Sequence, residues 1–331
     1  MWTTCNSKST VNKFEKIIQQ EIKLFDNKFK QTLSSKASLL YKITKYVSHS
    51  SGKKIRPICT ILASGLSDNI TEKTYRSAIL IELLHTATLI HDDIVDDAQL
   101  RRAKPSLNAV WKNKIAVLTG DYFLAKGLEL AVIHKDYDIL NLISQVVQKI
   151  VEGELLQIEK TKKLNLTEED YFQIIKLKTA SLFQCSFKVG AIASEVNTVT
   201  IDNLSELGLI IGNIFQIKDD ILDYDITNKS GKQLGNDILE GKINLPLLYA
   251  IRKMNLVEKN QVYRLLRKKT NSLEEITFIK KQVVRYHGIQ EAIEIMEINY
   301  NKAMGILNTF PSNNYKKAIK LLLSFLTQRT R

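Results

Sequence analysis

Apolar residues recur every three or four positions along most of this chain, a spacing that places them on one face of a helix. Residues 11–33 show the pattern first, with apolar side chains at positions 14, 17, 18, 22, 24, 25 and 29. The same pattern predicts helices over 36–48, 57–67, 72–97, 108–133, 137–160, 168–195 and 202–226. Residues 244–328 are helical in pattern throughout, with breaks near 270–272, Gly288 and 310–314. We therefore expect an all-α fold.

Composition supports long helices in one domain. Glycine and proline are scarce, at 13 and 4 of 331 residues, which favours helices over a turn-rich β fold. No linker-like segment divides the chain, so we expect a single domain over 13–331 and a frayed tail at 1–12. The tail is rich in Ser, Thr and Lys, as transit peptides are, but it is short, lacks Arg and has no apolar secretory core.

Several classes of protein are disfavoured. No run of 18 or more apolar residues occurs, so we expect no membrane span. Cys5, Cys59 and Cys185 are far apart without a CxxC motif, which argues against a zinc site and fits a reducing compartment. The net charge of +13 permits nucleic acid, an anionic membrane or phosphorylated substrates as partners. Without a zinc-finger spacing, an RNP-type motif or a recognition helix, we do not expect nucleic-acid binding.

The strongest local feature is an apolar helix that runs into four aspartates. Residues 82–102 read ELLHTATLIHDDIVDDAQLRR, with Asp92 and Asp96 four apart and therefore on one helix face. Their like charges repel, so they favour either proton uptake or a cation between them. Carboxylate oxygens with room for water suit Mg²⁺, and nearby arginines suit phosphate. Alone, the motif is also compatible with a solvated acidic helix end.

A second copy of the acidic pattern changes that balance. Asp219, Asp220 and Asp223 again end an apolar helix, in the segment GNIFQIKDDILDYD, and Asp219 and Asp223 are again four apart. Two facing acidic helix ends can clamp one polyphosphate through several metal ions.

Basic residues occur in loops beside these motifs. The segment SSGKKIRP at 50–57 places cations at the start of a helix, which is a natural phosphate cradle. A Gly- and Lys-containing loop at 227–241 is typical of a lid that closes on phosphate. Lys178 lies in an apolar helix, where burial without a partner is costly, so it belongs either to the surface or to a site.

Five motifs, in order and at the expected spacing, resemble those of the all-trans polyprenyl diphosphate synthases. The resemblance covers about residues 13–328, and the segments that carry it are 52–57 (GKKIRP), 82–102, 178–179 (KT), 215–223 (FQIKDDILD) and 231–246 (GKQLGNDILEGKINLP). It implies an isoprenoid-synthase-type bundle of antiparallel helices around a central cavity, usually a homodimer. The bacterial and plastid members that it resembles suggest the cytoplasm or the plastid stroma, of which the chloroplast is favoured. Peripheral membrane contact at product release is compatible with the resemblance.

The resemblance also implies a reaction and a cofactor. An allylic diphosphate ionises to a carbocation and pyrophosphate, the double bond of isopentenyl diphosphate attacks the cation, and a proton is lost. About three Mg²⁺ ions per site would bind Asp92, Asp96 and Asp219, with Asp93, Asp220 and Asp223 in support. The other roles follow residue by residue: Arg101, Lys178, Lys232 and Lys242 neutralise the allylic diphosphate; Lys53, Arg56, His85 and Arg102 hold isopentenyl diphosphate; Gln216 and the Thr179 carbonyl stabilise the cation.

Two departures from the family pattern stand out. Ser51-Gly52 replaces a pair of glycines before the first lysine, and Asn244 stands where threonine is common. Neither removes a charged group, so we expect an active enzyme.

Product length depends on the helix before the first aspartates. One helical turn rises about 5.4 Å, close to one isoprene unit, so a bulky residue about one turn before Asp92 would form a floor. Ala87 and Thr88 are small and open the path toward Leu84. We therefore expect a product longer than farnesyl, in the range used for quinone side chains. Geranylgeranyl diphosphate synthase is the alternative, because a neighbouring helix can supply a floor.

Two other functions compete with chain elongation. A class I terpene cyclase shares the first aspartate motif but usually lacks the second, and it needs no site for a second diphosphate. A non-catalytic partner subunit would keep the fold without turnover by itself.

Overall fold

The structure is a computed structural model that describes residues 13–50, 52–101, 104–224, 235–268 and 272–329. The tail at 1–12 and the predicted site residues Arg102 and Lys232 lie outside these ranges. The described chain is almost entirely helical, and its one sheet is the two-stranded hairpin β1 (Leu100–Arg101) and β2 (Lys104–Pro105). The all-α prediction is therefore confirmed.

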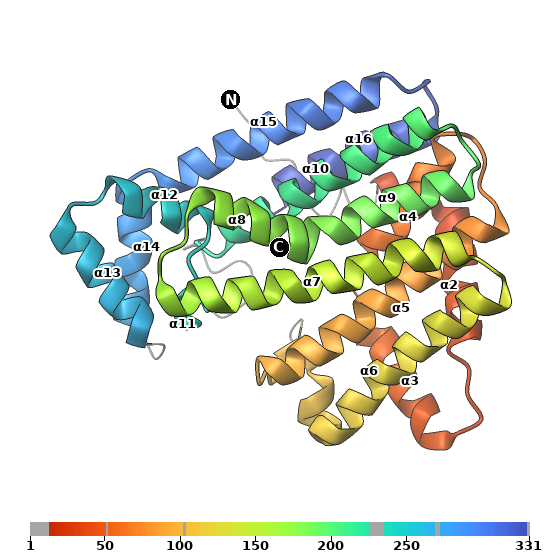
Figure 1. Ribbon diagram of the computed structural model, residues 1–331, viewed down its shortest axis with the longest axis horizontal. Coiled ribbons are helices and arrows are strands. Elements are labelled where there is room, and N and C mark those ends of the chain that lie inside the picture. Colours follow the sequence, from red (N-terminus) through yellow and green to blue (C-terminus); the bar gives the residue numbers. More distant parts are fainter. Residues whose placement is uncertain (1–12, 51, 102–103, 225–234, 269–271, 330–331) are drawn as a thin grey trace.

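The first half of the chain forms helices that run back and forth along the molecule (Figure 1). These are α2 (Gln19–Thr32), α3 (Ser38–Ser50), α4 (Ile55–Gly65), α5 (Glu72–Val95), α6 (Leu107–Ile133) and α7 (Tyr137–Lys163). The next group contains α8 (Glu168–Ile175), the π-helical turn η1 (Lys176–Ala180), α9 (Ser181–Ala193) and α10 (Thr198–Leu222). The last group is α11 (Asn236–Leu239), α12 (Leu245–Lys253), α13 (Leu256–Lys268), α14 (Leu273–Arg285), α15 (Gly288–Asn308) and α16 (Asn314–Gln328).

Two helices, α5 and α10, form the centre of the bundle. Helix α5 packs against α4, α6 and α9, and α10 packs against α9, α15 and η1. Both helices are apolar around most of their circumference, as expected for helices that are covered on nearly every side. Each carries its aspartates at its C-terminal end, so the packing of α5 and α10 positions both acidic motifs.

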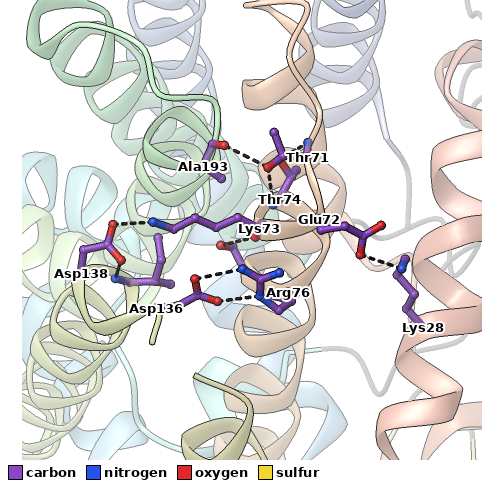
Figure 2. A network of polar contacts seen from close by, with 11 residues as sticks. Lys28, Thr71, Glu72, Lys73, Thr74, Arg76, Asp136, Asp138 and Ala193 are labelled. Atoms are coloured by element: carbon purple, nitrogen blue, oxygen red, sulfur yellow. Dashed lines mark hydrogen bonds and ion pairs between the residues drawn. The ribbon is translucent and has the colours of Figure 1, made fainter. Parts of the chain in front are cut away.

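The N-terminal end of α5, opposite the aspartates, is held by polar contacts (Figure 2). Thr71 caps the helix by accepting from the Thr74 backbone N–H, and its hydroxyl donates to the carbonyl oxygen of Ala193 in α9. Arg76 forms two hydrogen bonds with Asp136 at the start of α7, at 2.7 and 3.1 Å. This end of α5 is thereby fixed to both α7 and α9.

Most predicted helices are confirmed with shifts of a few residues at their ends, and four details differ. The segment at 168–195 is divided by η1, where one residue more per turn distorts the helix. The chain also turns between α12 and α13, where the side chain of Asn255 accepts from the Glu258 N–H. The hairpin at 100–105 and the short helix α11 within the predicted lid are too short for periodicity to reveal.

Candidate active site

The first acidic helix end brings Asp92 and Asp96 together, as their spacing predicted. Asp92 is the last but three residue of α5, and the Asp96 N–H donates to the Asp92 carbonyl at 2.8 Å. Burial raises the pKa of Asp92 to about 6; Lys178 opposes the shift, whereas Glu154 and Asp96 add to it. Burial also raises the pKa of Asp96, opposed by Lys242. Both carboxylates therefore lie where an added cation would stabilise their charged forms.

Asp93 differs from Asp92 in its burial and in its hydrogen-bond partners. Its side chain is buried, and Arg101 Nε lies 2.7 Å from both of its carboxylate oxygens. The side-chain amide of Asn108 donates to the carbonyl oxygens of Asp93 and Ala98, which secures the turn between α5 and the hairpin. Arg101, predicted to bind phosphate, is thus held beside the first motif by an acidic partner.

The second acidic helix end contains one buried aspartate, Asp220, and two partly exposed ones, Asp219 and Asp223. Asp220 is 4% exposed and accepts hydrogen bonds on both oxygens. Its donors are the Tyr171 hydroxyl (2.6 Å), Gln216 Nε2 (2.8 Å) and the Leu245 N–H (3.3 Å). Burial and the nearby Asp237 raise the pKa of Asp220. Asp219 is half-buried and pairs with Arg329 of the C-terminal segment at 2.8 Å.

Lys178 lies on η1, where its charge opposes the rise that burial causes in the pKa values of Asp92 and Asp96, and 31% of its side chain is exposed. Its ammonium contacts the carboxylate of Glu154 and donates to Gln157 Oε1 at 2.7 Å. Both partners lie on α7. Gly153 lets the two segments approach, because a Cβ there would lie 2.9 Å from the Lys178 backbone nitrogen.

A cavity of about 130 Å³ collects several of the predicted catalytic residues. Its wall includes Lys178, Thr179, Gln216, Asp220 and Lys242. The Thr179 hydroxyl donates to Gln216 Oε1 at 2.9 Å, so these two residues are directly connected. The cavity therefore lies against the second aspartate motif. Ala87, Thr88 and Leu84 do not line it.

Lys242 approaches from the segment after α11. Its ammonium pairs with Glu240, and its backbone N–H donates to the Asp237 carbonyl at 2.7 Å. Asn244 accepts from the Tyr224 hydroxyl at 2.7 Å, donates to Asp237 Oδ2 at 2.8 Å and caps α12. The departure from threonine at 244 thus supplies an amide that joins α10, the Lys242 segment and α12.

The predicted acceptor cations lie on the side of α4 and α5. Arg56 Nη1 donates to Nε2 of His85 at 2.9 Å, which brings these two predicted ligands together. The guanidinium of Arg56 lies 4.8 Å from the ring centroid of Phe183 and 5.7 Å from that of Phe215. Lys53 lies 4.5 Å from the ring centroid of Phe325 in α16. Cation–π contacts therefore orient both side chains.

The residues predicted to control product length lie on two faces of α5. Ala87 is fully buried in a cluster with Leu83, Phe123 and other residues between α5 and α6. Leu84 is buried in a second cluster, with side chains of α7 and α9. Thr88 is partly exposed, and its hydroxyl donates to the His85 carbonyl at 2.9 Å.

The carboxylate donors fit divalent metal ions whose coordination is completed by groups other than protein side chains. Within the described ranges, no three His, Cys, Asp or Glu side chains are close enough together to hold one ion by themselves. Mg²⁺ commonly binds one or two carboxylates and completes its shell with water and substrate phosphate. The carboxylates of Asp92, Asp96 and Asp219 therefore fit divalent ions that complete their coordination with water or phosphate oxygens.

Comparison with known proteins agrees with this geometry. Residues 37–283 match the polyprenyl synthetase family. The chain belongs to the polyprenyl synthetase family. It is 32% identical over 313 residues to heptaprenyl diphosphate synthase component 2 of Bacillus subtilis, covering 94% of this chain and 89% of that one. It is 33% identical to the all-trans-nonaprenyl-diphosphate synthase of Rhodobacter capsulatus, covering 91% and 93%.

A solved member of this polyprenyl synthetase family has nearly the same fold. The polyprenyl synthase of Caulobacter crescentus, in complex with calcium and isoprenyl diphosphate, has a TM-score of 0.91 at 28% identity, over 100% of both chains. The isoprenoid-synthase-type bundle is therefore confirmed.

Several site residues were not found from the sequence. Glu154 and Gln157 had only a weak signal, because they lie three apart on α7, a helix that carries many other polar residues. Tyr171 and Arg329 had none, because their contacts with Asp220 and Asp219 join segments that are distant in the chain.

Proposed function

We propose that this chain is a Mg²⁺-dependent trans-prenyltransferase that adds isopentenyl diphosphate to an allylic diphosphate. The observation that carries the proposal is the pairing of two acidic helix ends with cations on both sides. Lys178 and Lys242 line the cavity beside Asp220, and we assign them to the allylic diphosphate. Arg56 and His85 are joined by a hydrogen bond, and we assign them to the other substrate. Residues 13–331 act as one catalytic domain in this proposal.

The allylic half of the site binds and ionises the first substrate. Asp92, Asp96 and Asp219 would hold Mg²⁺, with Asp93, Asp220 and Asp223 in support. The bound metal supplies positive charge that stabilises the departing pyrophosphate. Lys178, Lys242 and Arg101 add cationic groups from three different segments, and Lys232 joins them from outside the described ranges. Such charges, fixed in advance, favour the ionising transition state over the ground state.

The allylic carbocation must be stabilised without a nucleophile that would capture it. The carbonyl oxygens of Gln216 and Thr179 present the negative ends of dipoles but are poor nucleophiles, so they stabilise an allylic cation without capturing it. Lys53, Arg56 and His85, with Arg102, would bind the diphosphate of isopentenyl diphosphate and bring its double bond to that cation. The proton lost after addition goes to the pyrophosphate, so the step needs no side-chain base.

We propose a product longer than farnesyl, with quinone side chains as its use. The small residues Ala87 and Thr88 support this, together with the family relatives named for heptaprenyl and nonaprenyl products. A geranylgeranyl product is less favoured. Reversed-phase chromatography of the products made from labelled isopentenyl diphosphate measures the length directly, and a C20 limit would contradict the long-chain assignment.

One incubation separates elongation from cyclisation. Farnesyl diphosphate is supplied with and without isopentenyl diphosphate. We expect consumption only with both substrates, and a hydrocarbon or alcohol made from farnesyl diphosphate alone would indicate a cyclase instead. Mg²⁺-dependent turnover by the purified chain also distinguishes an enzyme from a non-catalytic subunit, which would need a partner.

The proposed assembly is a homodimer. Large apolar side chains are exposed along α6 and α7, namely Val117, Leu118, Leu128, Val132, Ile133, Val151, Leu155 and Ile158. The Bacillus subtilis relative is named as component 2 of its synthase, so a heteromeric assembly is the alternative. Sedimentation of the purified chain decides between a dimer and a monomer that awaits a different subunit.

The proposed location is the cytoplasm or the plastid stroma. The relatives named above are bacterial, which supports the cytoplasm. None of the described helices is long and apolar enough to cross a membrane. Release of a long product would need only peripheral membrane contact, which cosedimentation with vesicles tests.

A further inference from the structure

A buried tyrosine outside the predicted motifs contacts the second aspartate motif. Tyr171 lies in α8, is 4% exposed, and its hydroxyl donates to Asp220 Oδ2 at 2.6 Å. Burial and the neighbouring Asp220 raise the pKa of the Tyr171 phenol, so the hydroxyl keeps its proton and remains a donor. Tyr171 also lines the cavity that contains Lys178 and Thr179.

The contact continues through Asp220 to two residues with proposed catalytic roles. Gln216 Nε2 donates to the other oxygen, Asp220 Oδ1, at 2.8 Å. At the opposite end of the same amide, Gln216 Oε1 accepts from the Thr179 hydroxyl at 2.9 Å. Tyr171, Asp220, Gln216 and Thr179 therefore form one chain of hydrogen bonds across α8, α10 and η1.

This series of hydrogen bonds determines which end of the Gln216 amide faces Thr179. Asp220 Oδ1 accepts from the NH₂ end of Gln216, while Oδ2 accepts from the Tyr171 hydroxyl and the Leu245 N–H. The carbonyl end must then point toward Thr179 and the cavity. The Asp220 carboxyl group can hold the Gln216 amide in this orientation only if it does not rotate. The Tyr171 hydroxyl and the Leu245 N–H prevent rotation by donating to its second oxygen.

We propose that Tyr171 is a positioning residue for prenyl transfer, which holds Asp220 so that the Gln216 carbonyl faces the allylic cation. The inference rests on the proposed role of Gln216 in stabilising that cation. Without the Tyr171 hydroxyl, Asp220 rotates more freely and the Gln216 amide can reverse. An NH₂ group would then face a positive charge, which slows ionisation but leaves the diphosphate contacts intact.

The test is a double-mutant cycle with Tyr171→Phe and Gln216→Leu, both of which preserve most of the side-chain volume. We measure kcat and KM for each substrate, with rates normalised to the folded fraction from circular dichroism. We expect Tyr171→Phe to lower kcat about tenfold, the effect of losing one buried side-chain hydrogen bond, with each KM within about twofold. In the Gln216→Leu background, Tyr171→Phe should have no further effect.

Tyr249→Phe is the matched control. The Tyr249 hydroxyl also donates to a carboxylate, Glu168 Oε1 at 2.9 Å, and the ring is buried in the same hydrophobic cluster as Tyr171. We expect its kcat to equal that of the wild type.

The outcomes distinguish the proposed role of Gln216 from the proposed role of Tyr171. If Gln216→Leu itself leaves kcat unchanged, the proposed role of Gln216 fails and the inference fails with it. Suppose that Gln216→Leu slows the enzyme. If Tyr171→Phe alone has no effect, or if its reduction of kcat multiplies that of Gln216→Leu in the double variant, only the positioning role is overturned. A loss in Tyr171→Phe that resides in KM would likewise overturn it.

Discussion

Arg329 Nη2 lies 2.8 Å from Asp219 Oδ1, so the C-terminal segment neutralises one of the proposed metal ligands. The same guanidinium nitrogen donates to the Phe215 carbonyl at 2.8 Å, and the group lies 4.2 Å from the Phe215 ring centroid. The Arg329 side chain is 7% exposed, and its Nε has no hydrogen-bond partner among the residues that the structure describes. Burial lowers the pKa of Arg329, and Asp219 opposes that shift. A metal ion that binds Asp219 must therefore compete with this cation.

Arg329→Ala should lower the Mg²⁺ concentration needed for half-maximal activity. Removing a competing charge-assisted hydrogen bond worth about 1.5 kcal/mol predicts roughly a tenfold decrease. Arg264→Ala on α13 is the control, because that arginine lies outside the site, and it should leave the Mg²⁺ requirement unchanged. An unaltered requirement in Arg329→Ala would show that Asp219 and Arg329 do not compete for metal.

Lys178→Ala should reduce kcat by about 10²- to 10³-fold, the usual effect of removing one group that stabilises developing negative charge. Its ammonium is held by Glu154 and Gln157, which keeps it at the cavity wall. Steady-state rates with saturating Mg²⁺ measure the loss. Lys149→Ala on α7 is a control expected to retain activity. A Lys178→Ala variant with wild-type kcat would remove this lysine from the mechanism.

Ala87→Tyr should shorten the product to about farnesyl length, because a large ring about one helical turn before Asp92 obstructs the path of the tail. Chromatography of the products reports the chain length. The rate of the first condensation should change little, since the diphosphate groups bind elsewhere. Unchanged product length in a folded variant would refute this picture of the tail path.

Asp136→Ala should lower the free energy of unfolding by about 2–3 kcal/mol, because it leaves the partly buried charge of Arg76 without its bidentate partner. Denaturant unfolding measures the change. Asp138→Ala provides the comparison, because it breaks the more exposed pair with Lys73. That substitution should cost less than about 1 kcal/mol. Equal losses in the two variants would contradict the importance assigned to burial.

Leu128→Asp should convert the proposed homodimer to a monomer, because this exposed leucine lies on the apolar face of α6 and a charge there would be costly to desolvate. Sedimentation velocity measures the oligomeric state. Leu256→Asp, at an exposed leucine on α13, should leave the dimer intact. If Leu128→Asp remains dimeric, the interface lies elsewhere.

Helix positions could be predicted because they depend on residues close together in sequence. The three- and four-residue spacing of apolar side chains located α5 and α10, and it placed Asp92 and Asp96 on one face. The short hairpin and the π-helical turn were missed, because neither spans enough residues to show a period. The individual partners of Asp93 and Lys178 also could not be predicted, since Arg101 and Glu154 reach them through turns and helix packing.

Local sequence was enough to determine the helical fold, the two acidic helix ends and the positively charged residues that accompany them, because spacing and charge are properties of adjacent residues. Only the tertiary structure decided which aspartates are buried and hydrogen-bonded and which remain at least partly exposed. Asp92 is partly exposed and Asp96 exposed at the end of α5, whereas Asp93 and Asp220 are buried and hydrogen-bonded by Arg101 and Tyr171. The reason is that burial and hydrogen-bond partners depend on which distant segments pack together. Aspartates that are adjacent in sequence can therefore differ in exposure and in the groups that they contact.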